Sequence, residues 1–128
     1  MNIFKQLRKL GINIPVQYIN GTGNYHYYDQ VNDIIVIDLN AQLDDLLQSI
    51  VHEFIHHVQW MNGYRRIMIN ELSMQYDERT CEMHAEYICT HIEDFLGEDR
   101  RLDINDILTY YDNIIDYFYE GSDRYENI

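Results

Sequence analysis

The sequence predicts an α+β domain in which a small antiparallel or mixed sheet of about three strands packs on three longer helices. Two patterns indicate this class. Up to residue 40, runs of β-branched and aromatic residues alternate with turn clusters, and beyond it apolar residues recur at helical spacing. With 128 residues, 46% of them hydrophobic and 24% charged, the chain has the length and composition of one globular domain.

The N-terminal part is expected to form a short helix and then the sheet. Gly11 can end the helix, and Pro15 favours a sheet edge or an irregular start for the strand around it. The segment 33–39 is the strongest strand because it is rich in β-branched residues. The expected elements are a helix over residues 3–10 and strands over residues 12–19, 25–28 and 33–39.

Helical spacing dominates the rest of the chain. The first long helix takes Asn40 as its N-cap and ends at Gly63, and Asp103 caps the last one. The middle helix spans residues 77–96, after a segment at 65–72 that fits a loop or a short strand. The first helix buries Leu43, Leu46, Leu47, Ile50, Val51, Phe54, Ile55, Val58 and Met61. In order, the segments are two helices within residues 41–97, a helix over 103–120 and a tail at 122–128.

The negative net charge disfavours some classes of binding partner. The chain has 22 acidic and 9 basic residues, which gives a net charge of −13. This sign disfavours nucleic acid, whose phosphates need cationic contacts, and anionic membranes. No apolar run is long enough to span a bilayer, and the first ten residues do not resemble a secretion signal. We expect a peptide or protein partner, and a basic one fits the acidic surface; the oligomeric state stays open.

The two cysteines indicate a reducing compartment. Cys81 and Cys89 lie in a segment that is predicted to be helical. A rise of about 1.5 Å per residue separates them by about 12 Å along the helix, which is too far for a disulfide. A cytoplasmic location is therefore expected.

The most specific feature is the HEFIH sequence at residues 52–56. Two histidines four residues apart on a helix lie one turn apart on the same side, so both imidazoles can reach one ion. Glu53 lies next to them and can take a proton from a water on that ion. On a helical wheel, His52 and His56 fall opposite the apolar face. His57 falls at the edge of that face, where we expect a hydrogen-bonded core histidine rather than a ligand.

Two histidines do not complete a zinc site, because catalytic zinc usually has three protein ligands and one position for water. The third ligand is expected from the helix over residues 77–96. Glu82 lies on one flank of that helix, whereas His84 and His91 lie on the other. Since both flanks cannot face one metal, either Glu82 or His84 faces the histidines. The candidate ligands on this helix are Glu78, Cys81, Glu82, His84, Glu86, Cys89 and His91.

The HEFIH sequence, followed by EMHAE at residues 82–86, resembles the HExxH…ExxA arrangement of gluzincin metallopeptidases. Over residues 23–96, the order of strands, active-site helix and "glutamate helix" is similar to that of ImmA/IrrE-type metallopeptidases and of the very short minigluzincins. The resemblance implies a zincin-like fold, a bound Zn²⁺ and hydrolysis of peptide bonds. The residues that it assigns are the zinc ligands His52, His56 and Glu82 and the general base Glu53.

The same resemblance implies further roles. The segment 33–39 would be an edge strand that holds an extended peptide by strand addition. Glu78 or Glu86 would hold a ligating imidazole by its distal N–H, unless both belong only to a solvated acidic face. One of five side chains would stabilise the oxyanion, and the sequence does not choose among them: Tyr64, Tyr76, Tyr87, His84 and Tyr110.

Two other interpretations stay open. In the first, the chain is a catalytically inactive zincin-like module for binding or regulation, with a structural metal or none. A fourth ligand such as Cys81, Cys89 or His84 would favour it, because structural zinc sites are closed. In the second, the chain is a helical interaction domain in which HEFIH is a coincidence. The outward position of the two histidines counts against this second interpretation.

Overall fold

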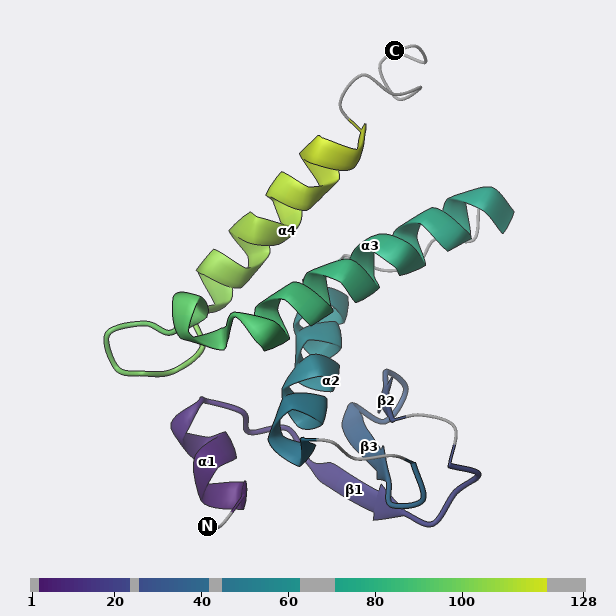
Figure 1. The fold of residues 1–128 in the computed structure, drawn as a ribbon, viewed down its shortest axis with the longest axis vertical. Coiled ribbons are helices and arrows are strands. Elements are labelled where there is room, and N and C mark those ends of the chain that lie inside the picture. The colour runs from purple at the N-terminus through teal and green to yellow at the C-terminus, as the bar shows by residue number, and fades with distance from the viewer. Residues whose placement is uncertain (1–2, 24–25, 42–44, 63–70, 120–128) are drawn as a thin grey trace.

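The computed structural model describes residues 3–23, 26–41, 45–62 and 71–119, and the side chains of 71–79 and 115–119 lie outside the description. The elements are α1 (Ile3–Lys9), β1 (Val16–Ile19), β2 (Tyr27–Asp29), β3 (Ile34–Asp38), α2 (Leu46–Met61), α3 (Glu71–Thr90), the 3-10 helix η1 (Ile92–Phe95) and α4 (Ile104–Tyr119). Helix α2 lies between the sheet and α3, and α4 packs on α3 (Figure 1). The α+β class and a sheet of three strands are confirmed.

The sheet is mixed, with the strand order β1-β3-β2. Strand β3 runs parallel to β1 and antiparallel to β2. The expectation that residues 33–39 form an edge strand is therefore wrong. Three consecutive apolar residues of β3, Ile35, Val36 and Ile37, are buried, which is typical of a strand covered on both faces. The edges are β2, which is short, and β1, which Pro15 precedes.

The Asp38 side chain, at the end of β3, is hydrogen-bonded to the backbone of two turns. Its carboxylate accepts backbone N–H bonds from Gly21 (3.1 Å), Gly23 (2.8 Å) and Asn40 (2.9 Å). These donors, that of Asn40 first, hold the pKa of Asp38 below its usual range. Gly23 has a φ of +83°, and a Cβ there would approach the carbonyl oxygen of Asn40 to 3.0 Å.

Helix α2 begins later than its sequence pattern predicts. The N-cap is Asp45, whose side chain accepts the N–H of Gln48 at 3.1 Å, and not Asn40, which belongs to the turn around Asp38. Leu43, which was expected on the buried face, lies outside the described residues. The helix ends at Met61, with Asn62 as its C-cap. Met61 was also expected on the buried face, but it is exposed at this end of the helix.

The later helices differ from expectation mainly at their ends. Helix α3 starts at Glu71, six residues before the predicted start, and it ends at Thr90 instead of 96. After His91, the chain continues as the 3-10 helix η1, whose Phe95 is buried in the core. Asp103 caps α4 as predicted, accepting the N–H of Asp106 at 3.1 Å. Residues 65–70 and the tail at 122–128 lie outside the described part.

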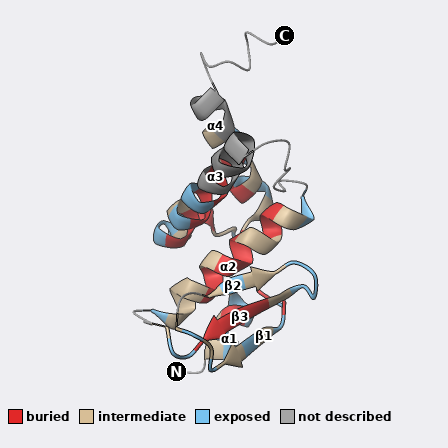
Figure 2. Ribbon diagram, turned by 90° about the vertical axis from the view of Figure 1, so that its right-hand side faces the viewer, coloured by how far each residue is buried: buried red, intermediate tan, exposed pale blue. Residues whose placement is uncertain are grey.

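The core fills the space between the sheet, α2, α3 and α4 (Figure 2). Helix α2 contributes a large part of this core, and its buried residues are Ile50, Val51, Glu53, Phe54, Ile55, Val58 and Gln59. Two of these are polar, which makes Glu53 and Gln59 unusual in such a setting. Among the described residues, no helix is both long and apolar enough to cross a membrane.

Candidate metal centre

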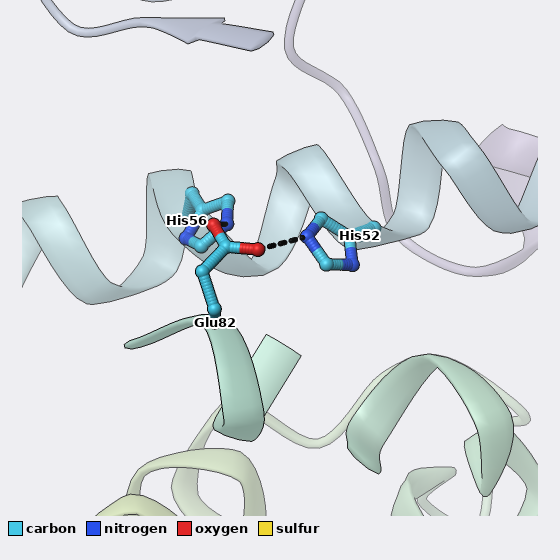
Figure 3. A group of neighbouring side chains, drawn as sticks. All are labelled: His52, His56 and Glu82. Atoms are coloured by element: carbon cyan, nitrogen blue, oxygen red, sulfur yellow. Dashed lines mark hydrogen bonds and ion pairs between the residues drawn. The ribbon is translucent and has the colours of Figure 1, made fainter. Parts of the chain in front are cut away.

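The crossing of α2 and α3 brings His52, His56 and Glu82 together (Figure 3). The Nε2 atom of His52 lies 3.3 Å from Oε2 of Glu82, and the Nε2 atom of His56 lies 2.8 Å from Oε1 of the same carboxylate. One donor atom from each residue falls within 4.8 Å of the others. Of the two flanks of α3 that the sequence leaves open, the one that carries Glu82 thus faces the histidines.

The group is open on one side. The side chains of His52 and His56 are 19% and 16% exposed, whereas that of Glu82 is 54% exposed. The two imidazoles stand one helical turn apart, with ring centroids 5.0 Å apart. Two sheltered nitrogens beside an exposed carboxylate could hold a metal ion and leave one side of it accessible to water.

The contact between His56 and Glu82 is not an ordinary hydrogen bond. The two atoms are 2.8 Å apart, yet Nε2 of His56 is buried and has no partner in hydrogen-bond geometry among the described residues. The two groups thus lie at ion-pair distance, although Nε2 is not in hydrogen-bond geometry with a described partner. Burial alone would lower the pKa of His56, but the carboxylates of Glu82 and Glu53 outweigh it and raise that pKa.

Glu53 is buried beside this group. Only 8% of it is exposed, because α2 is covered by both the sheet and α3. Burial raises the pKa of Glu53 to about 7, against the opposing effect of the charges on His56 and His52. The backbone N–H of Tyr28, in β2, also hydrogen-bonds to Glu53. A carboxyl group with a pKa near neutrality is suited to accept and release a proton.

A second layer of polar groups contacts the outer nitrogens of the two histidines. Oε2 of Glu86 lies 3.6 Å from Nδ1 of His52, which is within ion-pair reach but too long for a hydrogen bond. The side chain of Glu78, the other candidate for this role, lies outside the described part. Behind His56, Oε1 of Gln59 lies 2.9 Å from Nδ1.

The Gln59 contact is absent from the sequence-based predictions. A signal for it existed, because Gln59 falls on the same side of α2 as His52 and His56, one turn after His56. Its burial was not predictable from the pattern, since this side of α2 is covered by α3, which lies far away in the sequence.

Three of the other candidate ligands on α3 have partners outside the group. The Sγ of Cys81 lies 3.2 Å from the Tyr111 hydroxyl, Cys89 donates to the Gln48 carbonyl at 3.0 Å, and His84 contacts the Ile107 carbonyl at 2.8 Å. All three side chains thus point to other partners, and the group found among the described residues has three members. Among the side chains that the structure describes, the group thus has no fourth ligand of the kind that a closed structural site needs.

His57 is hydrogen-bonded as predicted, but it is only partly buried and does not belong to the core. Its Nδ1 atom donates to Asp33 at 2.7 Å on the sheet side of α2, so it is a hydrogen-bonded histidine and not a member of the group. Of the candidates for stabilising an oxyanion, Tyr87 stacks on Tyr110 with ring centroids 4.3 Å apart, and His84 is fully buried. The other two, Tyr64 and Tyr76, have side chains outside the described part.

Zn²⁺ fits the donor set. Tetrahedral zinc with bonds of about 2.0–2.2 Å holds adjacent ligand atoms about 3.3–3.6 Å apart. The 3.3 Å separation between His52 and Glu82 lies in this range, and the 2.8 Å separation between His56 and Glu82 is shorter. Two neutral imidazoles and one carboxylate leave the ion a net positive charge.

Comparisons of the chain with models of known protein families, with curated proteins and with solved structures found no match. The resemblance to gluzincins thus stays an expectation from two short motifs.

Proposed function

We propose that this chain is a zinc-dependent metallopeptidase of the gluzincin type. In this proposal, His52, His56 and Glu82 hold the ion and Glu53 is the general base. The observation that carries the proposal is the position of Glu82: a carboxylate from a second helix lies 2.8 and 3.3 Å from the two HEFIH histidines and is half exposed to solvent. A coincidental HEFIH sequence would not require a partner of this kind on α3.

The chemistry divides between the ion and the chain. Bound zinc supplies a Lewis acid that polarises the scissile carbonyl and favours ionisation of the attacking water. Glu53 takes the proton of that water on its carboxylate and delivers it to the leaving amine. Its raised pKa supports both halves of this role, since a group with a pKa near the working pH gains and loses a proton easily.

The substrate strand is proposed to lie along β2. Strand β3 is central and its two sides are already paired, so it has no edge to offer. Strand β2 is an edge strand that packs against α2 and whose Tyr28 contacts the general base. An extended peptide added beside β2 would place its carbonyl groups near Glu53 through backbone contacts.

The test compares wild type with Glu53→Gln, using Glu98→Gln as a control at an exposed position on the same chain. All three are loaded with Zn²⁺, assayed for zinc content, and incubated with a mixed peptide library read by mass spectrometry. We expect about one zinc per chain in each, cleavage by wild type and Glu98→Gln, and a loss of about 10²–10⁴-fold in Glu53→Gln.

Two outcomes would contradict the proposal. Cleavage that survives in Glu53→Gln would remove the general-base assignment. Zinc bound by wild type with no cleavage of any peptide would favour the inactive binding or regulatory module instead.

A further inference from the structure

A chain of buried polar groups runs behind His56 through the core. Gln59, on α2, is 2% exposed, and His84, on α3, is fully buried. The Gln59 amide contacts Nδ1 of His56 at 2.9 Å, the carbonyl of Cys81 at 3.0 Å and Nδ1 of His84 at 2.8 Å. His84 in turn contacts the carbonyl of Ile107, on α4, through Nε2 at 2.8 Å.

Two backbone carbonyls fix the donor and the acceptor of each hydrogen bond that links His56, Gln59 and His84. A carbonyl oxygen can only accept, so the end of the Gln59 amide that faces Cys81 must be the NH₂ group. For the same reason, the His84 nitrogen that faces Ile107 must carry a proton. Neutral His84 then has a bare Nδ1, which accepts the second N–H of Gln59.

The remaining end of the amide determines the protonation of His56. With its NH₂ group directed at Cys81 and His84, Gln59 presents its oxygen to Nδ1 of His56. An oxygen acceptor there requires Nδ1 to be protonated. In the neutral ring, the other nitrogen, Nε2, is then a bare lone pair.

This bare nitrogen is the atom that faces Glu82. Nε2 of His56 and Oε1 of Glu82 lie 2.8 Å apart without hydrogen-bond geometry, and the nitrogen is buried. Two acceptors at that distance repel each other unless a proton or a metal ion lies between them. The buried hydrogen bonds therefore leave the Nε2 lone pair of the neutral ring directed at the open group, where a proton or a metal ion can take it.

We propose that Gln59 and His84 are positioning residues that hold His56 in the tautomer whose Nε2 binds metal. Gln59 acts directly on His56, and His84 acts through Gln59. The step from lone pair to bound zinc rests on the proposed function, whereas the proton arrangement itself does not. The carbonyls of Cys81 and Ile107 tie this arrangement to α3 and α4, so the packing of three helices sets the protonation of one ligand.

The first test observes the tautomers in the metal-free protein. Long-range ¹H–¹⁵N spectra of the imidazole rings are recorded at a pH high enough for neutral rings, and His84→Phe and His56→Phe assign the signals. We expect the proton on Nδ1 in His56 and on Nε2 in His84. A His56 ring protonated on Nε2 would overturn the proposal whatever the zinc data show.

The second test measures Zn²⁺ affinity by competition with a chromophoric chelator. Gln59→Leu removes the acceptor for His56 and is expected to weaken zinc binding by about 10–100-fold, the usual range for groups that orient a ligand. His84→Phe is expected to weaken it less, because the Cys81 carbonyl still orients the amide. Gln59→Glu keeps an acceptor for Nδ1 and is expected to keep zinc affinity, while the new carboxylate facing Cys81 lowers stability.

Asn62→Ala serves as the control, since it removes a hydrogen bond to the Val58 carbonyl at the end of the same helix without contact to His56. If Gln59 were merely structural, zinc affinity would follow stability, and Gln59→Glu and Asn62→Ala would both lose it. Wild-type affinity in Gln59→Leu would overturn the proposal. Failure of the wild type to bind zinc would overturn the proposed function alone, and the tautomer spectra would then decide the proton arrangement.

Discussion

Helix α2 carries two clusters that each combine imidazole and carboxylate, on different sides. On the side of α3, His52 and His56 meet Glu82. On the side of the sheet, His57 meets Asp33, which also accepts the Tyr28 hydroxyl at 2.6 Å. The distances are similar, at 2.7 Å for His57 to Asp33 and 2.8 Å for His56 to Glu82. Distance alone therefore does not distinguish the two clusters.

The difference lies in where the protons are. In the Asp33 cluster, the contacts of the carboxylate with His57 and Tyr28 each pair a donor with an acceptor, so the group is complete without an ion. In the Glu82 cluster, a carboxylate oxygen faces a buried nitrogen that Gln59 leaves without a proton. An imidazole beside a carboxylate indicates a metal site only when the hydrogen bonds around it leave acceptors opposed.

The largest expected effect comes from replacing each carboxylate by its amide. Glu82→Gln removes a ligand and is expected to weaken zinc binding by on the order of 100-fold or more, because neutral amides are poor zinc ligands. Asp33→Asn is expected to change zinc affinity by less than about twofold. Both are measured by chelator competition. Similar losses in the two variants would show that the clusters are not different in kind.

A smaller effect is expected on the stability of the metal-free protein. The bond from Tyr28, and then the charge of His57, hold the pKa of Asp33 below its usual 3.8. A lowered pKa in the folded state gives stability that is fully present above about pH 3.8 and is lost as the pH falls through the folded pKa. Asp33→Asn keeps a residue type that tolerates the φ of +54° and is expected to cost about 1 kcal/mol at pH 7, since the site is half exposed.

The measurement is urea unfolding with a chelator present, at pH 7 and near pH 3. The difference between wild type and Asp33→Asn is expected to shrink at the lower pH. A difference that stayed constant would mean that the Asp33 carboxylate charge is not what stabilises this cluster.

The smallest effect on zinc affinity is expected from replacing Cys89. If Cys89 were a fourth ligand, the metal site would have no position left for water. Burial, followed by the charge of Glu86, raises the pKa of Cys89 to about 12, so its thiol stays protonated and donates to Gln48. We expect Cys89→Ser to change zinc affinity by less than about twofold. Folded protein at pH 8 should react with iodoacetamide at least about 100-fold more slowly at Cys89 than urea-unfolded protein. Rapid labelling, or loss of zinc in Cys89→Ser, would contradict the open site.

Local sequence patterns predicted the helices, strands and caps well, but they predicted less well which of these elements lie side by side in the fold. The helix that carries HEFIH, the β-branched strand at 34–38 and the Asp103 cap all depend on residues close in sequence, and the structure has them. The prediction of an edge strand at 33–39 was wrong because strand order depends on pairing between distant segments. The Asn40 cap was wrong because Asp38 recruits that residue into a turn with Gly21 and Gly23.

By itself, the sequence determined that two histidines share one face of a helix, because a period of 3.6 residues places positions 52 and 56 one turn apart. It could not decide which flank of α3 would face them, since either Glu82 or His84 satisfies the spacing. Packing decided this by burying His84 against α4 and leaving Glu82 half exposed at the crossing of α2 and α3. The position of a proton on His56 was also decided there, because it depends on carbonyl groups of Cys81 and Ile107 that only the folded chain brings within hydrogen-bond distance.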